Sequence, residues 1–325
     1  MKRNTKIALI VGGVAAVSAA ASAVISQLIT KTLIKEALDR EEPELLKKAN
    51  VNISGGSGNY EREIKLARER AKELENNENI KRIEIRSHDG IKLVGHLYPA
   101  ENAKRLVVAV HGWRSRWSSD FSLISSFWHD NGCTVLFIDQ RGQGDSDGDT
   151  MGFGLTERYD CLDWIDYIEQ INENNLPIYL AGLSMGATTV LMASGLALPE
   201  NVHGIMADCG FTSPKAIWKH VAEDNLHLSY KIREKQIDLL CRQKTNFGSE
   251  DGSTLTALAE NTVPVLFIHG AADSFVPVEM TYENYKACIA PKRILIVPGA
   301  EHALSYIVDT ESYQAIVKDF WREHD

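Results

Sequence analysis

A serine flanked by two glycines, at a junction between a strand and a helix, is the feature that most constrains how this chain can fold. The pentapeptide is GLSMG, residues 182–186, and it follows the apolar run PIYL, residues 177–180. The glycines permit the close backbone approach that such a tight turn requires, and the serine between them can be held strained with its hydroxyl pointing outward. G-x-S-x-G in this setting is typical of a nucleophilic serine, so Ser184 is the first candidate catalytic residue.

A nucleophilic serine needs a base to take its proton and an acid to orient that base. Downstream, the strand-like run VPVLFIHG is followed by Asp273, and the last such run, RILIVPG, is followed by His302. Serine, acid and histidine in this chain order, each after a strand, are the arrangement expected for an α/β-hydrolase. Asp208 also follows a strand and competes for the role of the acid. We favour Asp273, because the residues after Asp208 indicate the start of an inserted segment.

Eight short apolar runs alternate with helix-like segments from residue 81 onward, which predicts an α/β domain with a mostly parallel sheet covered by helices on both faces. The first two runs are separated only by residues 88–90, HDG, and predict an antiparallel hairpin. The interval between the sixth and seventh runs, about residues 213–260, is longer than a crossover needs and predicts a helical cap. The strands are expected at 82–87, 92–99, 105–112, 134–140, 177–184, 203–210, 263–270 and 293–299.

The first 34 residues differ from the rest of the chain. MKRNTK carries three basic residues, and residues 7–30 contain no charged side chain, which is long enough for a helix that spans a bilayer. Residues 18–23, SAAASA, also resemble the cleavage site of a signal peptide. We favour an uncleaved single-pass anchor in the cell membrane, because bulky apolar residues continue past that site, and the basic leader predicts an extracytoplasmic location for the remainder. Secretion after signal cleavage is the alternative.

Composition indicates how the rest of the chain is organised and which partners it excludes. Residues 35–80 are rich in Glu, Lys and Arg and predict a charged helical stalk or linker, which leaves residues 81–325 for the catalytic domain. The net charge of −9 and the lack of a basic stripe argue against a nucleic-acid partner. The cysteines are odd in number and lack C-x-x-C spacing, so we interpret them as mostly buried thiols and expect no metal. They are Cys133, Cys161, Cys209, Cys241 and Cys288.

From about residue 81 to residue 325 the chain resembles the α/β-hydrolase superfamily, in particular its bacterial serine-aminopeptidase-like and Bem46-like branch. The resemblance rests on five separate motifs, VVAVHGW, DQRGQGDS, GLSMGA, HGAADSFVP and GAEHA. It implies the α/β-hydrolase fold with a catalytic triad. VVAVHGW resembles the oxyanion strand and turn, so we assign the oxyanion donors to the backbone N–H groups of Trp113 and Met185. Arg114, Arg116 and Trp117, after this turn, are interpreted as residues of a solvated loop.

The function expected from these residues is that of a serine hydrolase without a cofactor, which cleaves an ester, thioester or amide through an acyl-enzyme. We favour a carboxylesterase that acts on a small-molecule substrate with a short to medium acyl chain, because apolar residues of the cap can wall an acyl pocket. A serine peptidase for short peptides and a non-catalytic, membrane-tethered binding module are the alternatives. The cap residues expected at the pocket are Trp218, Leu226, Leu228 and Tyr230.

Overall fold

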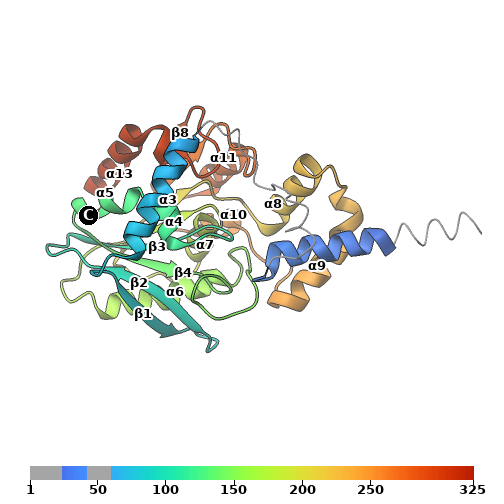
Figure 1. Ribbon diagram of the computed structural model, residues 1–325, viewed down its shortest axis with the longest axis horizontal. Helices are drawn as coiled ribbons and strands as arrows, with labels where there is room; N and C mark the ends of the chain where they lie inside the picture. The colour runs from blue at the N-terminus through green and yellow to red at the C-terminus, as the bar shows by residue number, and fades with distance from the viewer. Residues whose placement is uncertain (1–23, 42–59) are drawn as a thin grey trace, which may run out of the picture.

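One eight-stranded sheet forms the centre of the protein in the computed structural model, which describes residues 24–41 and 60–325 (Figure 1). The strand order is β1-β2-β4-β3-β5-β6-β7-β8. β1 pairs antiparallel with β2, and β2 pairs antiparallel with β4, whereas all other pairs are parallel. The strands are β1 (Lys81–Arg86), β2 (Lys92–Tyr98), β3 (Arg105–Val110), β4 (Cys133–Asp139), β5 (Ile178–Leu183), β6 (Val202–Asp208), β7 (Val265–Gly270) and β8 (Lys292–Val297).

Burial along the strands follows their place in the sheet. β3, β4 and β7 are buried at every position, as expected for parallel strands that are covered on both faces. β1 lies at the edge of the sheet, and its residues alternate between exposed and half-buried. All eight predicted strands and the predicted hairpin are therefore confirmed.

Helices cover both faces of this sheet, and alternate residues of one strand contact different helices. Val108 of β3 lies in one core cluster with Trp164, whereas Val107 lies in the other with Trp128. The helices of the first face are α6 (Glu157–Gln170), α7 (Met185–Ala193), α10 (Thr254–Leu258) and α11 (Val278–Ala287). Those of the second face are α3 (Glu61–Glu75), α4 (Trp117–Phe121), α5 (Ile124–Asp130) and α13 (Thr310–His324).

The predicted cap between the sixth and seventh strands is present. It consists of α8 (Pro214–His220), a π-helical turn η1 (Val221–Asn225) and α9 (Tyr230–Thr245), which precede α10. A third core cluster joins the cap to a helix over residues 24–38, because Ile34 and Leu38 are buried together with Trp218 and Ile237. Figure 1 shows this N-terminal helix lying alongside α9.

The N-terminal helix bears on two sequence predictions. The boundary predicted at residue 34 falls inside it, and the predicted stalk over residues 35–80 includes α3, which packs against α4. Most of the predicted membrane segment lies outside the described residues. Within the described ranges, no helix combines the length and the apolar character needed to cross a membrane.

Candidate active site

Ser184 occupies a strained turn between β5 and α7, as the sequence predicted. Its backbone angles are φ 55° and ψ −117°, a conformation that L-residues rarely adopt. A Cβ on Gly182 would lie 2.4 Å from the carbonyl oxygen of Gly186, and one on Gly186 would lie 1.9 Å from that of Val110. Only glycine fits at both positions, so the two glycines make the sharp turn possible.

The three predicted triad residues form one hydrogen-bonded line. His302 Nε2 lies 2.9 Å from Ser184 Oγ, and His302 Nδ1 lies 2.6 Å from Asp273 Oδ2. They come from the loops that follow β5, β7 and β8, which end at the same edge of the sheet. These distances place a base within reach of the hydroxyl proton and an acid behind the base.

Asp273 is held as a buried carboxylate. Its Oδ1 accepts hydrogen bonds from the backbone N–H groups of Phe275 and Val276, at 2.9 and 2.8 Å. Burial by itself would raise the pKa of the Asp273 carboxyl, but contacts with His269 and His302 outweigh it and hold this pKa below its usual range. Asp273 is therefore ionised at neutral pH and can stabilise an imidazolium.

His269 contacts Asp273, which the sequence analysis did not predict. Its Nε2 lies 3.1 Å from Asp273 Oδ2 and 2.9 Å from the carbonyl oxygen of Val276. Both partners are acceptors, so this nitrogen carries the proton, and Nδ1 lies 2.7 Å from Thr281 Oγ1. The available signal was its place at the end of β7, four residues before Asp273.

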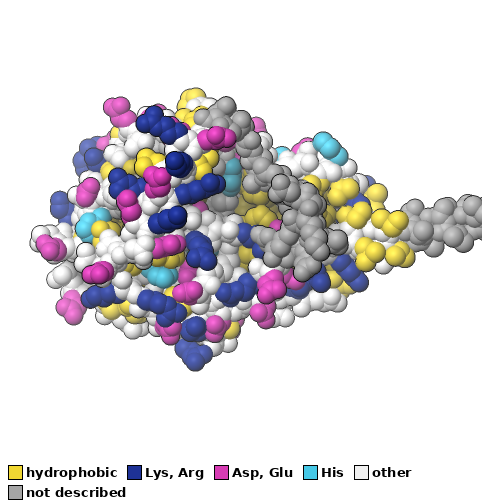
Figure 2. Space-filling view, viewed as in Figure 1, with side chains coloured by type: hydrophobic (Ala, Val, Ile, Leu, Met, Phe, Trp, Pro, Cys, Tyr) yellow, Lys and Arg dark blue, Asp and Glu magenta, His cyan; other side chains and the backbone are white. Residues whose placement is uncertain are grey.

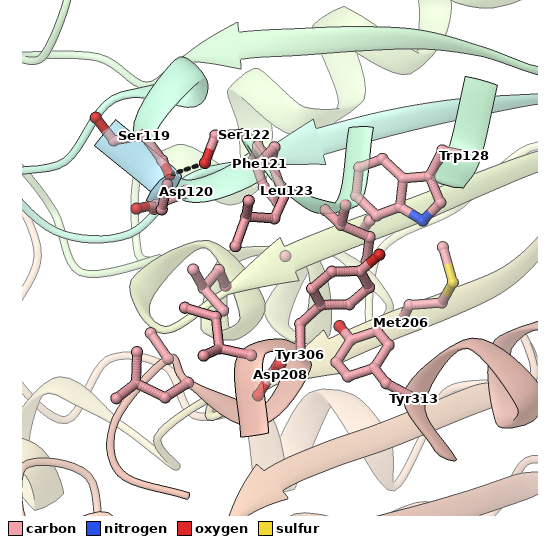
Figure 3. A pocket seen from close by; sticks show the side chains of 18 of the residues that line it. Ser119, Asp120, Phe121, Ser122, Leu123, Trp128, Met206, Asp208, Tyr306 and Tyr313 are labelled. Atoms are coloured by element: carbon pink, nitrogen blue, oxygen red, sulfur yellow. Dashed lines mark hydrogen bonds between the residues drawn. The ribbon is translucent and has the colours of Figure 1, made fainter. Parts of the chain in front are cut away.

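Asp208, the competing acid, is bonded elsewhere. Its Oδ1 accepts a hydrogen bond from Ser305 Oγ at 3.2 Å, and burial raises the pKa of its carboxyl to about 6. Figure 3 shows its side chain near Tyr306 and Tyr313, in a cavity of about 310 Å³ on the sheet face that α3, α4 and α13 cover. Asp273, and not Asp208, hydrogen-bonds His302.

The two predicted oxyanion donors belong to residues near Ser184, because Met185 directly follows it and Trp113 lines the same cavity as Ser184. Met185 is the first residue of α7, where a backbone N–H has no acceptor within its own helix. Trp113 follows a turn in which the Gly112 N–H donates to Asp120 Oδ2 at 2.7 Å and His111 Nδ1 lies 2.8 Å from the Gly112 oxygen. In the described part of the chain, neither donor N–H takes part in a backbone hydrogen bond of a turn or loop.

Comparisons with known proteins agree with this fold. A family model described as serine aminopeptidase, S33, matches residues 101–247. The uncharacterised protein YqkD of Bacillus subtilis (strain 168) is 25% identical over 240 residues, which cover 73% of this chain and 77% of YqkD. The uncharacterised protein YfhR of Escherichia coli (strain K12) is 24% identical over 226 residues, which cover 68% of this chain and 72% of YfhR.

Solved structures also match this fold. The Pyrococcus furiosus esterase Pf2001 superposes with a TM-score of 0.64 and 20% identity, covering 78% of this chain and 93% of that one. Est1E of Butyrivibrio proteoclasticus, solved with ferulic acid, has a TM-score of 0.59 and 22% identity, covering 74% of this chain and 98% of that one. The chain has the α/β-hydrolase fold. Its distant likeness to these two structures is a likeness of fold.

A small apolar cavity has Ser184 in its wall. Its volume is about 90 Å³, and it lies between the cap and the N-terminal helix. Of the cap residues predicted there, Trp218 and Leu226 line the cavity, whereas Leu228 and Tyr230 do not. The N-terminal helix contributes Thr30, Leu33, Ile34, Glu36 and Ala37.

The interpretation of Arg114, Arg116 and Trp117 as residues of a solvated loop is wrong for two of these three. The Arg114 side chain is only 13% exposed, because it donates hydrogen bonds to backbone carbonyls at the end of the N-terminal helix. Trp117 is buried and stacks on His96, with ring centroids 4.3 Å apart. Arg116 is exposed, as expected.

The five cysteine thiols are free and buried, as predicted for most of them. Cys209 lies near Asp273 and His302, and their potential ligand atoms are within 4.8 Å of one another. Burial raises the pKa of the Cys209 thiol, which disfavours the thiolate that binds metals. Since Asp273 and His302 also bond each other, we assign no metal to this group. The second group of potential ligands in the described chain is His88, Asp160 and Asp163.

Proposed function

We propose that this α/β-hydrolase is a serine esterase that cleaves carboxylic esters with short acyl chains through an acyl-enzyme. The observation that carries the proposal is the hydrogen-bonded line from Asp273 through His302 to Ser184, because Ser184 lies in the wall of an apolar cavity. A nucleophile, a base and an acid in hydrogen-bond contact are the parts that acyl transfer requires.

The chemistry follows from this arrangement. His302 Nε2 takes the proton of Ser184 Oγ as that oxygen attacks the ester carbonyl carbon, and the Asp273 carboxylate stabilises the imidazolium. The N–H groups of Trp113 and Met185 stabilise the oxyanion of the tetrahedral intermediate. The C–O bond to the alcohol then breaks, and His302 returns the proton to the leaving alcohol. Water repeats the sequence on the acyl-enzyme and releases the acid.

The size of the cavity supports a short acyl chain. A single water needs about 10–15 Å³ of such space, so a cavity of about 90 Å³ holds on the order of six groups of that size. Its lining is apolar and aromatic, with Phe153, Phe211 and Trp218 among the lining residues. An acyl chain of a few carbons fills this space, whereas a long chain requires the cap or the N-terminal helix to move.

The description of the matching family as a serine aminopeptidase favours a second candidate, hydrolysis of aminoacyl amides. An aminopeptidase needs an anionic group for the substrate's ammonium. Glu36 is the acidic residue in the cavity wall, and its carboxylate lies 3.4 Å from the Arg114 guanidinium. We favour the esterase because this carboxylate is already paired.

A substrate panel tests the proposal. Purified full-length protein in detergent should hydrolyse p-nitrophenyl acetate and butyrate with a kcat/KM about tenfold or more above that for the decanoate, since longer chains exceed the cavity. Leucine p-nitroanilide should be cleaved at the background rate. Each rate is divided by that of uncatalysed hydrolysis before comparison. A larger acceleration over uncatalysed hydrolysis for the aminoacyl amide than for the esters would contradict the esterase and support the peptidase.

We also propose that the chain is tethered to the cell membrane, with the hydrolase domain outside the cytoplasm. The support is the basic leader followed by the uncharged residues 7–30. Val24, Ile25 and Leu28 of the N-terminal helix are 56–58% exposed, and Figure 2 shows hydrophobic side chains gathered at this end of the cap.

Membrane fractionation tests the tether. The chain should stay with membranes after alkaline carbonate extraction, and its intact mass should include Met1. Release by carbonate would contradict the anchor. A soluble chain that begins near residue 24 would instead support the cleaved signal.

A further inference from the structure

We propose that the N-terminal helix, residues 24–38, holds the oxyanion turn in its working conformation through the side chain of Arg114. This inference rests on the proposed function, because it concerns the donor N–H of Trp113. It makes Arg114 a positioning residue and makes a segment about 150 residues before Ser184 part of the catalytic apparatus.

The first observation is backbone strain beside the proposed donor. Arg114 has φ 50°, in the left-handed region that residues with a Cβ seldom adopt. Arg114 directly follows Trp113, so its conformation helps to set the turn that carries the Trp113 N–H. Such strain persists only where the surrounding contacts enforce it.

The second observation identifies those contacts. Arg114 Nη2 donates to the carbonyl oxygens of Glu36 and Asp39, at 2.6 and 2.7 Å. Nε donates to the Glu36 oxygen at 3.1 Å, and Nη1 donates to that of Arg40 at 3.1 Å. The last carbonyls of a helix lack intrahelical donors and form the negative end of its dipole, so a guanidinium is well suited to bind them.

Trp113 itself is bound to the same helix end. Its indole Nε1 donates to the carbonyl oxygen of Ala37 at 2.9 Å. Two consecutive side chains of the oxyanion turn are thus fixed by neighbouring carbonyls of one helix. A shift of the helix end would move both side chains and the backbone between them.

The helix end is in turn fixed to the body of the hydrolase. The Met151 N–H donates to the Leu38 oxygen at 2.7 Å, and the Arg40 N–H donates to the Asp149 oxygen at 2.8 Å. Lys244 of α9 lies 2.5 Å from Asp39 Oδ1. Because the loop after β4 and the cap both bind this segment, its carbonyls present a fixed surface to Arg114.

The same helix turn also lines the acyl cavity, through Ile34, Glu36 and Ala37. The N-terminal helix in this position therefore both closes the cavity and fixes the oxyanion turn. An enzyme whose helix is displaced would lose transition-state stabilisation while Ser184, His302 and Asp273 remain in contact.

Two substitutions at one position in the full-length chain separate positioning from general stability. Arg114→Ala and Arg114→Gly both delete the guanidinium, but only alanine opposes the left-handed backbone, by an energy worth about fivefold to thirtyfold in a rate. Arg114→Ala should lower kcat for p-nitrophenyl acetate by about 100-fold, the usual cost of one oxyanion donor, with little change in KM. Arg114→Gly should retain about five to thirty times the kcat of Arg114→Ala.

Arg116→Ala, in the same loop and exposed, is the matched control and should keep the parental kcat. If Arg114→Ala does not fold, Trp113→Phe removes the indole bond to Ala37 and keeps a ring in place. It should lower kcat by about threefold or more, the value of one net hydrogen bond, at constant KM.

Parental kcat in the alanine variant, or equal losses in the alanine and glycine variants, would overturn the inference. If Trp113→Phe is the variant measured, an unchanged kcat would overturn it. A folded parent protein without any serine-dependent ester hydrolysis would instead refute the proposed function, so the two failures are distinguishable.

Discussion

Replacing Ser184 with alanine is expected to lower kcat for p-nitrophenyl acetate by about a million-fold, down to the residual rate that binding and the oxyanion donors supply. Ser184 Oγ is the atom that His302 contacts at 2.9 Å. Removal of this oxygen ends acyl-enzyme formation while the cavity and Asp273 stay in place. Stopped assays at high enzyme concentration, corrected for spontaneous hydrolysis, measure the loss.

Ser194→Ala is the matched control for this substitution. Ser194 is also buried and is the C-cap residue of the same helix, α7, where its hydroxyl donates to the Leu191 oxygen at 2.7 Å. Its replacement should leave kcat close to the parental value. If Ser184→Ala keeps activity within tenfold of the parent while its fold is intact, the hydrolysis does not pass through this serine.

Asp273→Asn is expected to lower kcat by about four orders of magnitude. The Asp273 carboxylate accepts from His302 Nδ1 at 2.6 Å and so keeps the proton off Nε2, which faces Ser184. An asparagine amide can donate to Nδ1 instead, which favours the tautomer that carries its proton on Nε2 and cannot act as the base. Steady-state kinetics at neutral pH measure the loss, and retention of more than a tenth of the parental kcat would contradict the role of Asp273.

The stability of the same variant relative to the parent should also change at acidic pH, because the pKa of Asp273 is lower in the folded chain than its usual 3.8. Such a carboxyl stabilises the fold above its unfolded pKa, and this contribution is lost as the pH falls through the folded value. The parent should therefore exceed Asp273→Asn in unfolding temperature at pH 7, and the gap should narrow as the pH falls below about 4.

Asp208→Asn is a control for which the pH dependence of stability has the opposite sign. Burial raises the pKa of Asp208 from 3.8 to about 6, so its contribution to stability is present below the unfolded pKa and is lost as the pH rises through about 6. The shift of this pKa corresponds to a change in the free energy of unfolding on the order of 3 kcal/mol across this pH range. Asp208→Asn should therefore gain stability relative to the parent between pH 4 and pH 7, as thermal unfolding monitored by circular dichroism can show.

The sheet and the triad were predictable because their signals are local. A buried parallel strand is a short apolar run, and each triad residue directly follows such a run, so the topology alone brings Ser184, Asp273 and His302 to one edge. The glycines of the serine turn have an equally local cause, since a Cβ at either position would meet backbone atoms.

The packing of the N-terminal helix could not be predicted from the sequence. An apolar segment can be buried in a bilayer or against protein, and its composition does not distinguish the two solvents. Ile34 is buried against the cap, although the sequence analysis assigned residues 1–34 to a membrane segment. The contacts of Arg114 and His269 were not predicted, for a related reason. Their partners are backbone carbonyls and a carboxylate brought near by tertiary packing.

Covalent labelling with a fluorophosphonate, followed by peptide mapping, tests the central claim most directly, because the reagent reacts with serines that are activated as nucleophiles. We expect one adduct per chain, located on Ser184, and slower labelling of Asp273→Asn. Absence of an adduct in folded protein, or an adduct on another residue, would contradict it.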